Sequence, residues 1–154
     1  MHLYSGFSGS IVASAIGTVA WCVCRKLNVH ENYKLGPSGD PRDYEPIMMK
    51  FLRLSEYLLG VATGSIVLIV GSSALHGQAG FLPWFYASPL ILIAASVIYG
   101  LSFMACQILT YEHVLHGFPH TAKQYTLNEM LGYSSLITFV IGYLWLIIAA
   151  TNMH

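Results

Sequence analysis

The distribution of charged residues constrains the fold of this chain more than any other feature. Three runs carry no Asp, Glu, Lys or Arg: residues 1–24, 57–111 and 130–154. A membrane-spanning helix needs about 20 consecutive apolar residues, so the first and last runs each have room for one helix. The middle run has room for two and is interrupted by the glycines and prolines of residues 71–89. The chain is therefore predicted to cross a membrane four times.

The composition favours the same class of protein. Only 9% of the 154 residues are charged and 55% are hydrophobic, whereas an ordinary soluble domain is about 25% charged. A soluble protein of this size needs charge to cover its large surface. The formal net charge is zero, so no basic field is present to bind nucleic acid. We predict one domain, residues 1–154, that is all-α and forms an integral membrane four-transmembrane-helix bundle with the lipid bilayer as its surroundings.

The spans are predicted over approximate ranges, with a sidedness that follows from the basic residues. The ranges are 6–27, 46–75, 88–115 and 127–151, with Thr126 or Asn128 as the cap at the start of the last span. All seven Lys and Arg residues lie in or beside the connections between spans one and two and between spans three and four. The positive-inside rule places these two connections in the cytoplasm and both termini outside. This predicts a multi-pass protein of a cell or organelle membrane.

The second span opens with the stretch RDYEPIMMKFLRLSEYLLG, residues 42–60, which holds six of the fourteen charges. Lys50, Arg53 and Tyr57 are spaced to share one helix face, with Glu56 beside them. Ionisable groups at membrane depth usually face a bundle interior or a cavity and pair there. This face is therefore a candidate ligand site, with the basic groups for a carboxylate and Glu56 for an amine. The alternative is that Lys50 and Arg53 extend to the lipid head groups, which the shorter Glu56 cannot do.

The end of the third span carries a second polar cluster. Glu112, His113, His116 and His120 could form a metal site, although a helix C-terminus also favours histidine through its dipole. No standard zinc spacing is present, and the histidines lie at the span ends rather than facing each other within the membrane. We therefore predict neither a metal nor a haem, and the role of these histidines stays open.

Two further polar and small-residue features concern packing between helices. Gln107 lies inside the apolar third span and needs a hydrogen-bond partner. Small residues, among them Gly60, Gly64, Gly71 and Gly100, allow neighbouring helices to approach closely.

The stretch at the start of the second span also carries a resemblance to a known family. Tyr44-Glu45, followed eleven residues later by Glu56-Tyr57, opens the second of four helices, after CRKL at the end of the first. Together with QYTLNEML at the start of the fourth, this layout resembles the MAPEG proteins, the membrane-associated proteins of eicosanoid and glutathione metabolism. The resemblance implies a homotrimer that binds glutathione between subunits near the cytoplasmic side.

The resemblance also implies an activity and a set of contacts. A MAPEG-like protein would act as a transferase or isomerase on a lipophilic electrophile that enters from the bilayer. Glu56 and Tyr57 match the family as glutathione contacts, and Tyr111 and Tyr125 match more loosely. With Lys50 and Arg53 they make up the predicted glutathione site, while the catalytic residues stay unassigned.

The chain departs from the family pattern in ways that favour a second function. Arg53 stands where the family has asparagine, Met49 stands where it has arginine, and no arginine follows Arg53. The family uses an arginine of the third helix to activate the thiol, so the alternative is a non-catalytic accessory subunit of a larger membrane complex. A transporter or channel is less favoured, because the acidic residues lie at span ends rather than at the midplane.

Overall fold

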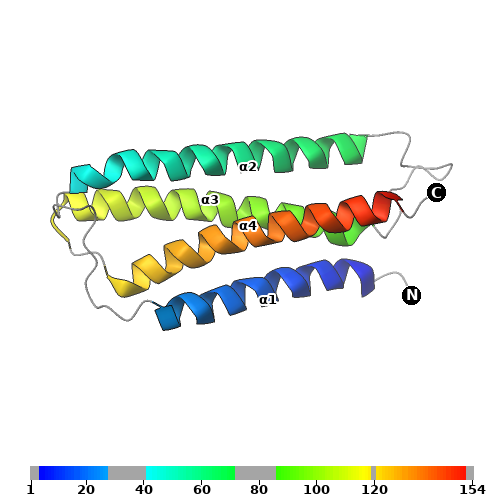
Figure 1. Cartoon of the computed structure of the whole chain (residues 1–154), viewed down its shortest axis with the longest axis horizontal. Coiled ribbons are helices and arrows are strands. Elements are labelled where there is room, and N and C mark those ends of the chain that lie inside the picture. The colour runs from blue at the N-terminus through cyan, green and yellow to red at the C-terminus, as the bar shows by residue number, and fades with distance from the viewer. Residues whose placement is uncertain (1–3, 28–40, 72–85, 119–120, 152–154) are drawn as a thin grey trace.

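The computed structural model describes residues 4–27, 41–71, 86–118 and 121–151. They form four long helices, α1 (Tyr4–Leu27), α2 (Glu45–Gly71), α3 (Ala87–Leu115) and α4 (Ala122–Thr151), with a 3₁₀ turn η1 (Pro41–Tyr44) before α2 (Figure 1). All four helices are long and apolar enough to cross a membrane. The predicted all-α bundle of four spans is therefore confirmed. The loop at 28–40 and the predicted end of the second span at 72–75 lie outside the described residues.

The helices run alternately up and down, so their ends gather in two groups. α1 and α3 end where α2 and α4 begin, and α1 begins at the opposite end, where α4 finishes (Figure 1). The first group, which we call the charged end, carries Arg25, Lys26, Asp43, Glu112 and Lys123. The assignment of the charged end to the cytoplasm stays a prediction.

Helix α3 is the centre of the bundle. It contacts α1, α2 and α4, and α4 also packs along α1. Leu92 and Ile93 on α3 are completely buried. α2, by contrast, packs mainly on α3, and its only buried residues are Met48 and Ala62. Helix α2 thus packs against the rest of the subunit on one side only.

Close contact at the core depends on two glycines that leave room for the facing helix. A Cβ at Gly142 of α4 would lie 2.9 Å from Ile93 Cγ1 of α3, and one at Gly9 of α1 would lie 2.7 Å from the Ser88 carbonyl oxygen of α3. Small residues at such points let helix backbones approach in a membrane, where lipid gives no hydrophobic force between helices.

Hydrogen bonds between helices complete the core. Ser135 of α4 donates to the Ser96 carbonyl at 2.9 Å, and Tyr99 of α3 donates to the Ala13 carbonyl at 3.2 Å. Each such bond in a membrane contributes about 0.6 kcal/mol on average. Gln107 has the partner it was predicted to need, because the Tyr44 hydroxyl donates to Gln107 Oε1 at 2.9 Å.

Helix α4 begins earlier than predicted, and its cap is a different residue. The Thr121 N–H donates to Gln124 Oε1 at 2.9 Å, and the Gln124 N–H donates to Thr121 Oγ1 at 3.3 Å. This reciprocal pair is a capping box. Thr126 and Asn128, the predicted caps, lie inside the helix, so that prediction was wrong. The last charge-free run begins only after Lys123 and Glu129. The apolar pattern therefore places the start of the span later than the start of the helix.

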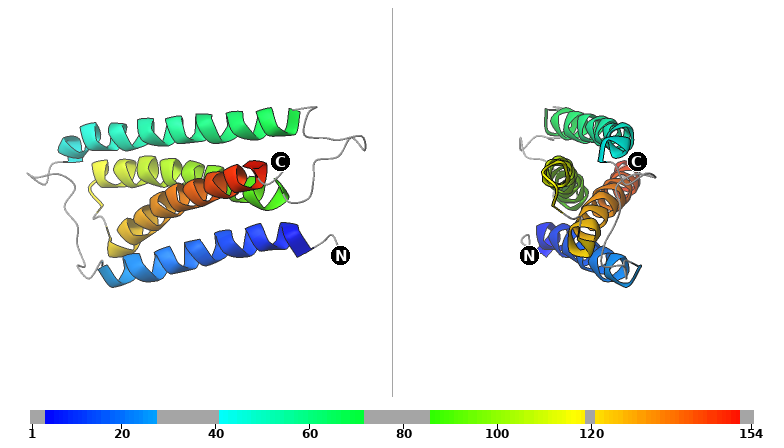
Figure 2. Two further views of the ribbon diagram at one scale, coloured as in Figure 1. Left: turned by 45° about the vertical axis from the view of Figure 1, so that its right-hand side comes forward. Right: turned by 90° about the vertical axis from the view of Figure 1, so that its left-hand side faces the viewer.

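Helix α4 crosses the bundle diagonally. It begins next to α1 at the charged end and finishes close to α2 at the other end (Figures 1 and 2). Near the far end, Tyr143 of α4 hydrogen-bonds to the Ser65 hydroxyl and donates to the Val61 carbonyl at 3.3 Å. α2 and α4 therefore diverge toward the charged end, with α3 behind them.

Candidate functional site

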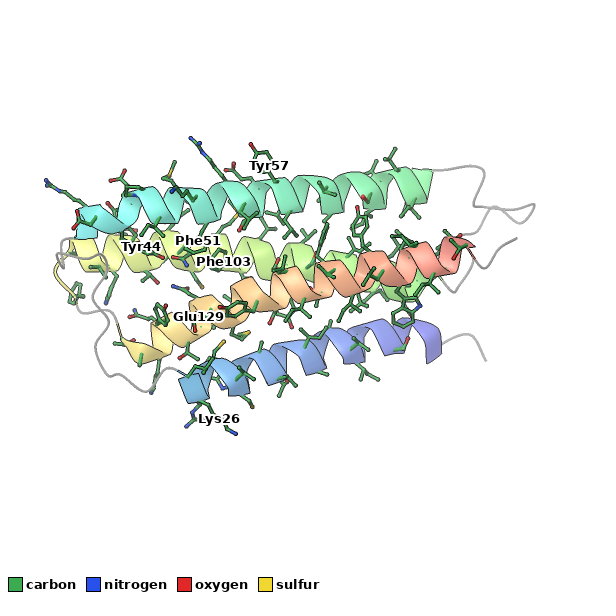
Figure 3. All side chains as sticks on the ribbon, in the orientation of Figure 1. Lys26, Tyr44, Phe51, Tyr57, Phe103 and Glu129 are labelled. Atoms are coloured by element: carbon green, nitrogen blue, oxygen red, sulfur yellow. The ribbon has the colours of Figure 1, made fainter. Side chains whose placement is uncertain are left out.

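Four of the six predicted site residues lie on the side of α2 that faces away from the rest of the subunit. We call this side, defined by Lys50, Arg53, Glu56 and Tyr57, the outer face of α2. All four are exposed, and Tyr57 keeps 74% of its surface accessible. Figure 3 shows Tyr57 pointing away from α3 and α4.

The position of this face follows from the helix repeat. Met48 and Ala62, the buried residues of α2, mark the side that packs on α3. Lys50, Arg53 and Tyr57 are spaced by three and four residues, so they share one face, and that face points to the opposite side. The structure therefore groups these side chains as the spacing predicts. None of them, however, lines either of the two cavities described below.

The other two predicted residues lie elsewhere. Tyr111 on α3 donates a hydrogen bond from its hydroxyl to Glu45 Oε2 at 3.3 Å, at the start of α2. Tyr125 on α4 lines a cavity between α2 and α4. Within one subunit, the six residues thus occupy three places. The four on α2 form a common surface, and the two tyrosines do not join it.

The cavity that Tyr125 lines is a groove inside the subunit, which we call the inner groove. It has a volume of about 250 Å³ and is lined by residues of η1, α2, α3 and α4. α3 supplies its floor with Phe103, Gln107 and Thr110, and the diverging helices α2 and α4 supply its walls. Phe51 of α2 packs edge-on against Phe103, with ring centroids 6.3 Å apart.

Both ends of the inner groove are marked by hydrogen bonds. At the charged end, the Tyr44 hydroxyl donates to Gln107, which joins η1, the turn directly before α2, to α3. Towards the far end, beyond the groove lining, Tyr143 joins α4 to α2 through Val61 and Ser65. As a whole, α2 packs far less on α4 than on α3.

A second cavity of about 480 Å³ lies at the charged end, between the end of α3 and the start of α4. Its lining includes Cys106, Glu112, His113 and His116. The His113 ring stacks on Phe118 at 4.6 Å, and His116 Nδ1 lies 2.8 Å from the Glu112 carbonyl oxygen, which can accept its hydrogen.

These groups do not form a metal centre in the described part of the chain. No three His, Cys, Asp or Glu residues lie close enough together there to hold a metal ion. His120 of the predicted cluster lies outside the described residues.

The two cavities share a wall. Thr110 of α3 and Asn128 of α4 line both, and Asn128 Nδ2 donates to Thr110 Oγ1 at 3.3 Å. Both side chains are buried, with 7% and 5% of their surface exposed. A buried polar contact therefore separates the inner groove from the cavity at the charged end.

The sequence interpretation missed most of the inner groove, including Tyr44, Asn128 and Glu129. One signal for it was present in α4: Tyr125, Glu129 and Tyr133 recur every four residues, and this spacing places them on one face. The opposing walls come from segments far away in the sequence, so the signal alone did not identify a cavity.

No protein-family model, curated protein or solved structure matches this chain.

Proposed function

We propose that this chain is a MAPEG-like membrane protein that binds glutathione at the outer face of α2 and acts on a lipophilic electrophile. The observation that carries the proposal is the gathering of Lys50, Arg53, Glu56 and Tyr57 on one exposed face. Charged groups that face lipid are costly unless they reach the head groups or meet a partner. A subunit boundary on this face would supply such cover and leave room for a ligand between two copies of the chain.

The chemistry of the outer face suits this ligand. The carboxylates of glutathione would pair with Lys50 and Arg53, and its amine would pair with Glu56. A hydrogen bond from the Tyr57 hydroxyl to the sulfur favours the thiolate over the thiol, because it stabilises the charged form. The thiol proton would pass to water, and the thiolate would attack an electrophilic carbon of the lipid. As the carbon–sulfur bond forms, the bond from that carbon to oxygen, or the π bond of a conjugated alkene, breaks, and the resulting anion takes a proton from water. In this scheme the outer face binds and activates the thiol, and the bilayer delivers the electrophile.

The proposal is tested by glutathione binding to the detergent-purified protein, measured by calorimetry. The wild type is expected to bind, and Glu56→Ala is expected to weaken binding roughly tenfold or more, because a charged hydrogen bond is lost. Glu112→Ala is the matched control, since this exposed glutamate lies at the end of α3 and not on the outer face. Absence of binding to the folded wild type, or an equal loss in both variants, would overturn the proposal.

The same face supports a second candidate function, that of an accessory subunit in a larger membrane complex. Gly60, Gly64 and Gly71 have no heavy atom of the described residues within 4 Å of where a Cβ would stand. Glycines in such a position give a foreign helix close access to α2. Mass measurement of the complex in mild detergent separates the candidates: a trimer of this chain supports the first, and co-purification with a different membrane protein supports the second.

A further inference from the structure

The inner groove is the cavity that the proposed function leaves unused. We infer that it binds a single-chain amphiphile whose head group is uncharged and both accepts and donates hydrogen bonds, as a carboxamide does. The groove lies on the opposite side of α2 from the proposed glutathione site, so the inference goes beyond glutathione binding and does not depend on it.

Three deeply buried side chains of the groove have hydrogen-bonding groups left over. Gln107, Thr110 and Asn128 all line the groove, and only 6%, 7% and 5% of their surfaces are exposed. Gln107 accepts from Tyr44 through Oε1, which leaves the hydrogens on Nε2. Asn128 donates to Thr110, which leaves Asn128 Oδ1 and the hydroxyl hydrogen of Thr110. Among the residues that the structure describes, none of these three leftover groups has a partner.

A head group of the right kind would satisfy all three. The lipid chains around a membrane-spanning bundle offer no hydrogen bonds, and a buried polar group without a partner is destabilising. A carbonyl oxygen has two lone pairs, one for the Gln107 amide and one for the Thr110 hydroxyl, and a neighbouring N–H can donate to Asn128 Oδ1. A carboxamide supplies both the acceptor and the donor.

The same three groups favour an uncharged head. None of them carries a charge, and burying an ion without an opposite charge costs far more than burying a neutral polar group. Tyr125 and Glu129 also line the groove, but each already has an interaction within the subunit. The head group is therefore assigned to the three neutral side chains alone.

The dimensions of the inner groove favour a slender ligand. Along α4 its lining extends from Tyr125 to Leu136, a distance of about 16 Å at 1.5 Å per residue. Its volume of about 250 Å³ is below the range of roughly 300–1,000 Å³ that is usual for drug-sized ligands. One hydrocarbon chain fits such a long, narrow space better than a bulky ring system or a two-chain lipid.

The polarity of the lining changes along the groove. Tyr44, Gln107 and Asn128 lie toward the charged end, and Figure 3 shows Tyr44 closer to that end than Phe51 and Phe103. The lining further into the bundle is mostly apolar and includes Leu54, Leu58, Phe103, Gly132 and Leu136. A lipid in the adjacent leaflet has the same direction, with its head at the interface and its chain toward the midplane. The groove therefore matches an amphiphile that keeps its orientation in the bilayer.

The groove lies at the surface of the subunit and is not sealed inside it. Leu54, Tyr133 and Leu136 line the groove and have 60%, 53% and 47% of their surfaces exposed. These residues belong to helices that are long and apolar enough to cross a membrane. An amphiphile of the bilayer is therefore the class of ligand that this lining suits.

The inference is tested by photolabelling the full-length protein in phosphatidylcholine vesicles. The probe is dodecanamide with a diazirine in its chain, and the matched probe is the methyl ketone of the same chain, in which CH₃ replaces NH₂. Both probes have the carbonyl acceptor, but only the amide can donate. We expect the amide to label peptides that contain residues 51–58 or 125–136, and the ketone to label them roughly fivefold less because it lacks one neutral hydrogen bond.

Two variants assign the head group to its partners. Asn128→Leu should reduce amide labelling to the level of the ketone and leave ketone labelling unchanged, because only the amide donates to Asn128. Gln107→Met should reduce labelling by both probes, because both use the carbonyl. Equal labelling of the wild type by amide and ketone, or equal losses for both probes in Asn128→Leu, would overturn the head-group assignment. Stronger labelling by dodecylamine with the same diazirine than by the amide would overturn the uncharged head.

A second pair of variants tests the location without altering the polar groups. Ser55→Trp places an indole in the groove wall, whereas Val67→Trp adds the same group at a position on α2 that is 69% exposed and outside the groove lining. Ser55→Trp should abolish the labelling and Val67→Trp should leave it unchanged. Amide labelling outside the two segments, or labelling that survives Ser55→Trp, would overturn the site itself.

Discussion

The two sides of α2 differ in what surrounds them. Its inner side meets Phe103 and Gln107 of α3 across a groove with apolar walls, whereas its outer face carries Lys50, Arg53 and Glu56 with no cover from the described part of the subunit. The side of α2 that faces the interior of the subunit has few charges, and the charged side of α2 faces outward. In a soluble protein the outer face would need no explanation. In a membrane it predicts either contact with lipid head groups or contact with another protein.

The difference extends to how tightly each side is packed. On the core helices, a Cβ added at Gly142 would meet Ile93 at 2.9 Å, but at Gly60, Gly64 and Gly71 of α2 it would meet no described heavy atom within 4 Å. Glycine therefore allows a close helix contact inside the subunit at Gly142, and it leaves an open surface on α2 at the other three positions. This distinction between packed and open glycines should hold in the isolated protein.

The largest effect is expected from Gly142→Val. The new side chain would meet both Cγ1 of Ile93 and its backbone nitrogen, the latter at 3.2 Å, and a backbone cannot move aside cheaply. Overpacking of this kind costs about 1–3 kcal/mol. Gly64→Val is the matched control and should change the free energy of unfolding by less than about 0.5 kcal/mol, as exposed positions usually do. Denaturant-induced unfolding in detergent micelles, followed by circular dichroism, measures both.

The control variant Gly64→Val also tests whether the outer face of α2 is open in the purified protein. If Gly64→Val destabilises the subunit as much as Gly142→Val does, the outer face is packed in the purified protein. If Gly64→Val changes only the size of the oligomer, the glycine face of α2 is the boundary between copies. If it changes neither property, lipid or detergent covers this face.

A smaller effect is expected from Asn128→Leu, which tests the wall between the two cavities. The substitution keeps a similar volume but removes the hydrogen bond to Thr110, whose side chain is 93% buried. The expected loss is about 1 kcal/mol, because a buried polar group is left without this partner. Tyr57→Phe removes a hydroxyl from the outer face and should change the free energy of unfolding less. A larger loss in Tyr57→Phe would show that the outer face takes part in a buried contact.

The sequence predicted the number and type of the helices because charge-free runs of the right length have few other solutions in a chain with so little charge. It also grouped Lys50, Arg53 and Tyr57 correctly, since the helix repeat alone decides which residues share a face. It did not show which way this face points. A membrane helix can be apolar on all sides, so its pattern does not separate the core side from the lipid side.

The inner groove was harder to predict because its parts come from three helices. Gln107 was identified as a buried group in need of a partner, but its partner Tyr44 lies 63 residues earlier in the chain. The width of the groove depends on the diagonal course of α4, which follows from local packing such as that of Gly142 on Ile93. The residue spacing within a single segment predicts neither the long-range partner of Gln107 nor the direction in which α4 crosses the bundle.

A local effect is expected from loosening α2 at its tie to α4. Tyr143→Phe removes the bonds to the Val61 carbonyl and the Ser65 hydroxyl, and a membrane hydrogen bond contributes about 0.6 kcal/mol, or roughly threefold in an opening equilibrium. Since α2 is held mainly by α3, the change should remain local. Hydrogen exchange followed by mass spectrometry should quicken in peptides from residues 61–71 and stay unchanged in α1.

The matched control for this tie is Tyr99→Phe, which removes the bond between α3 and the Ala13 carbonyl of α1. It should quicken exchange less than Tyr143→Phe does, because α1 is supported by both α3 and α4. Faster exchange across all four helices in Tyr143→Phe would contradict this account, since it would show that α2 and α4 share one cooperative core. Exchange confined to α2 would instead show that the wall of the inner groove moves independently of the rest of the bundle.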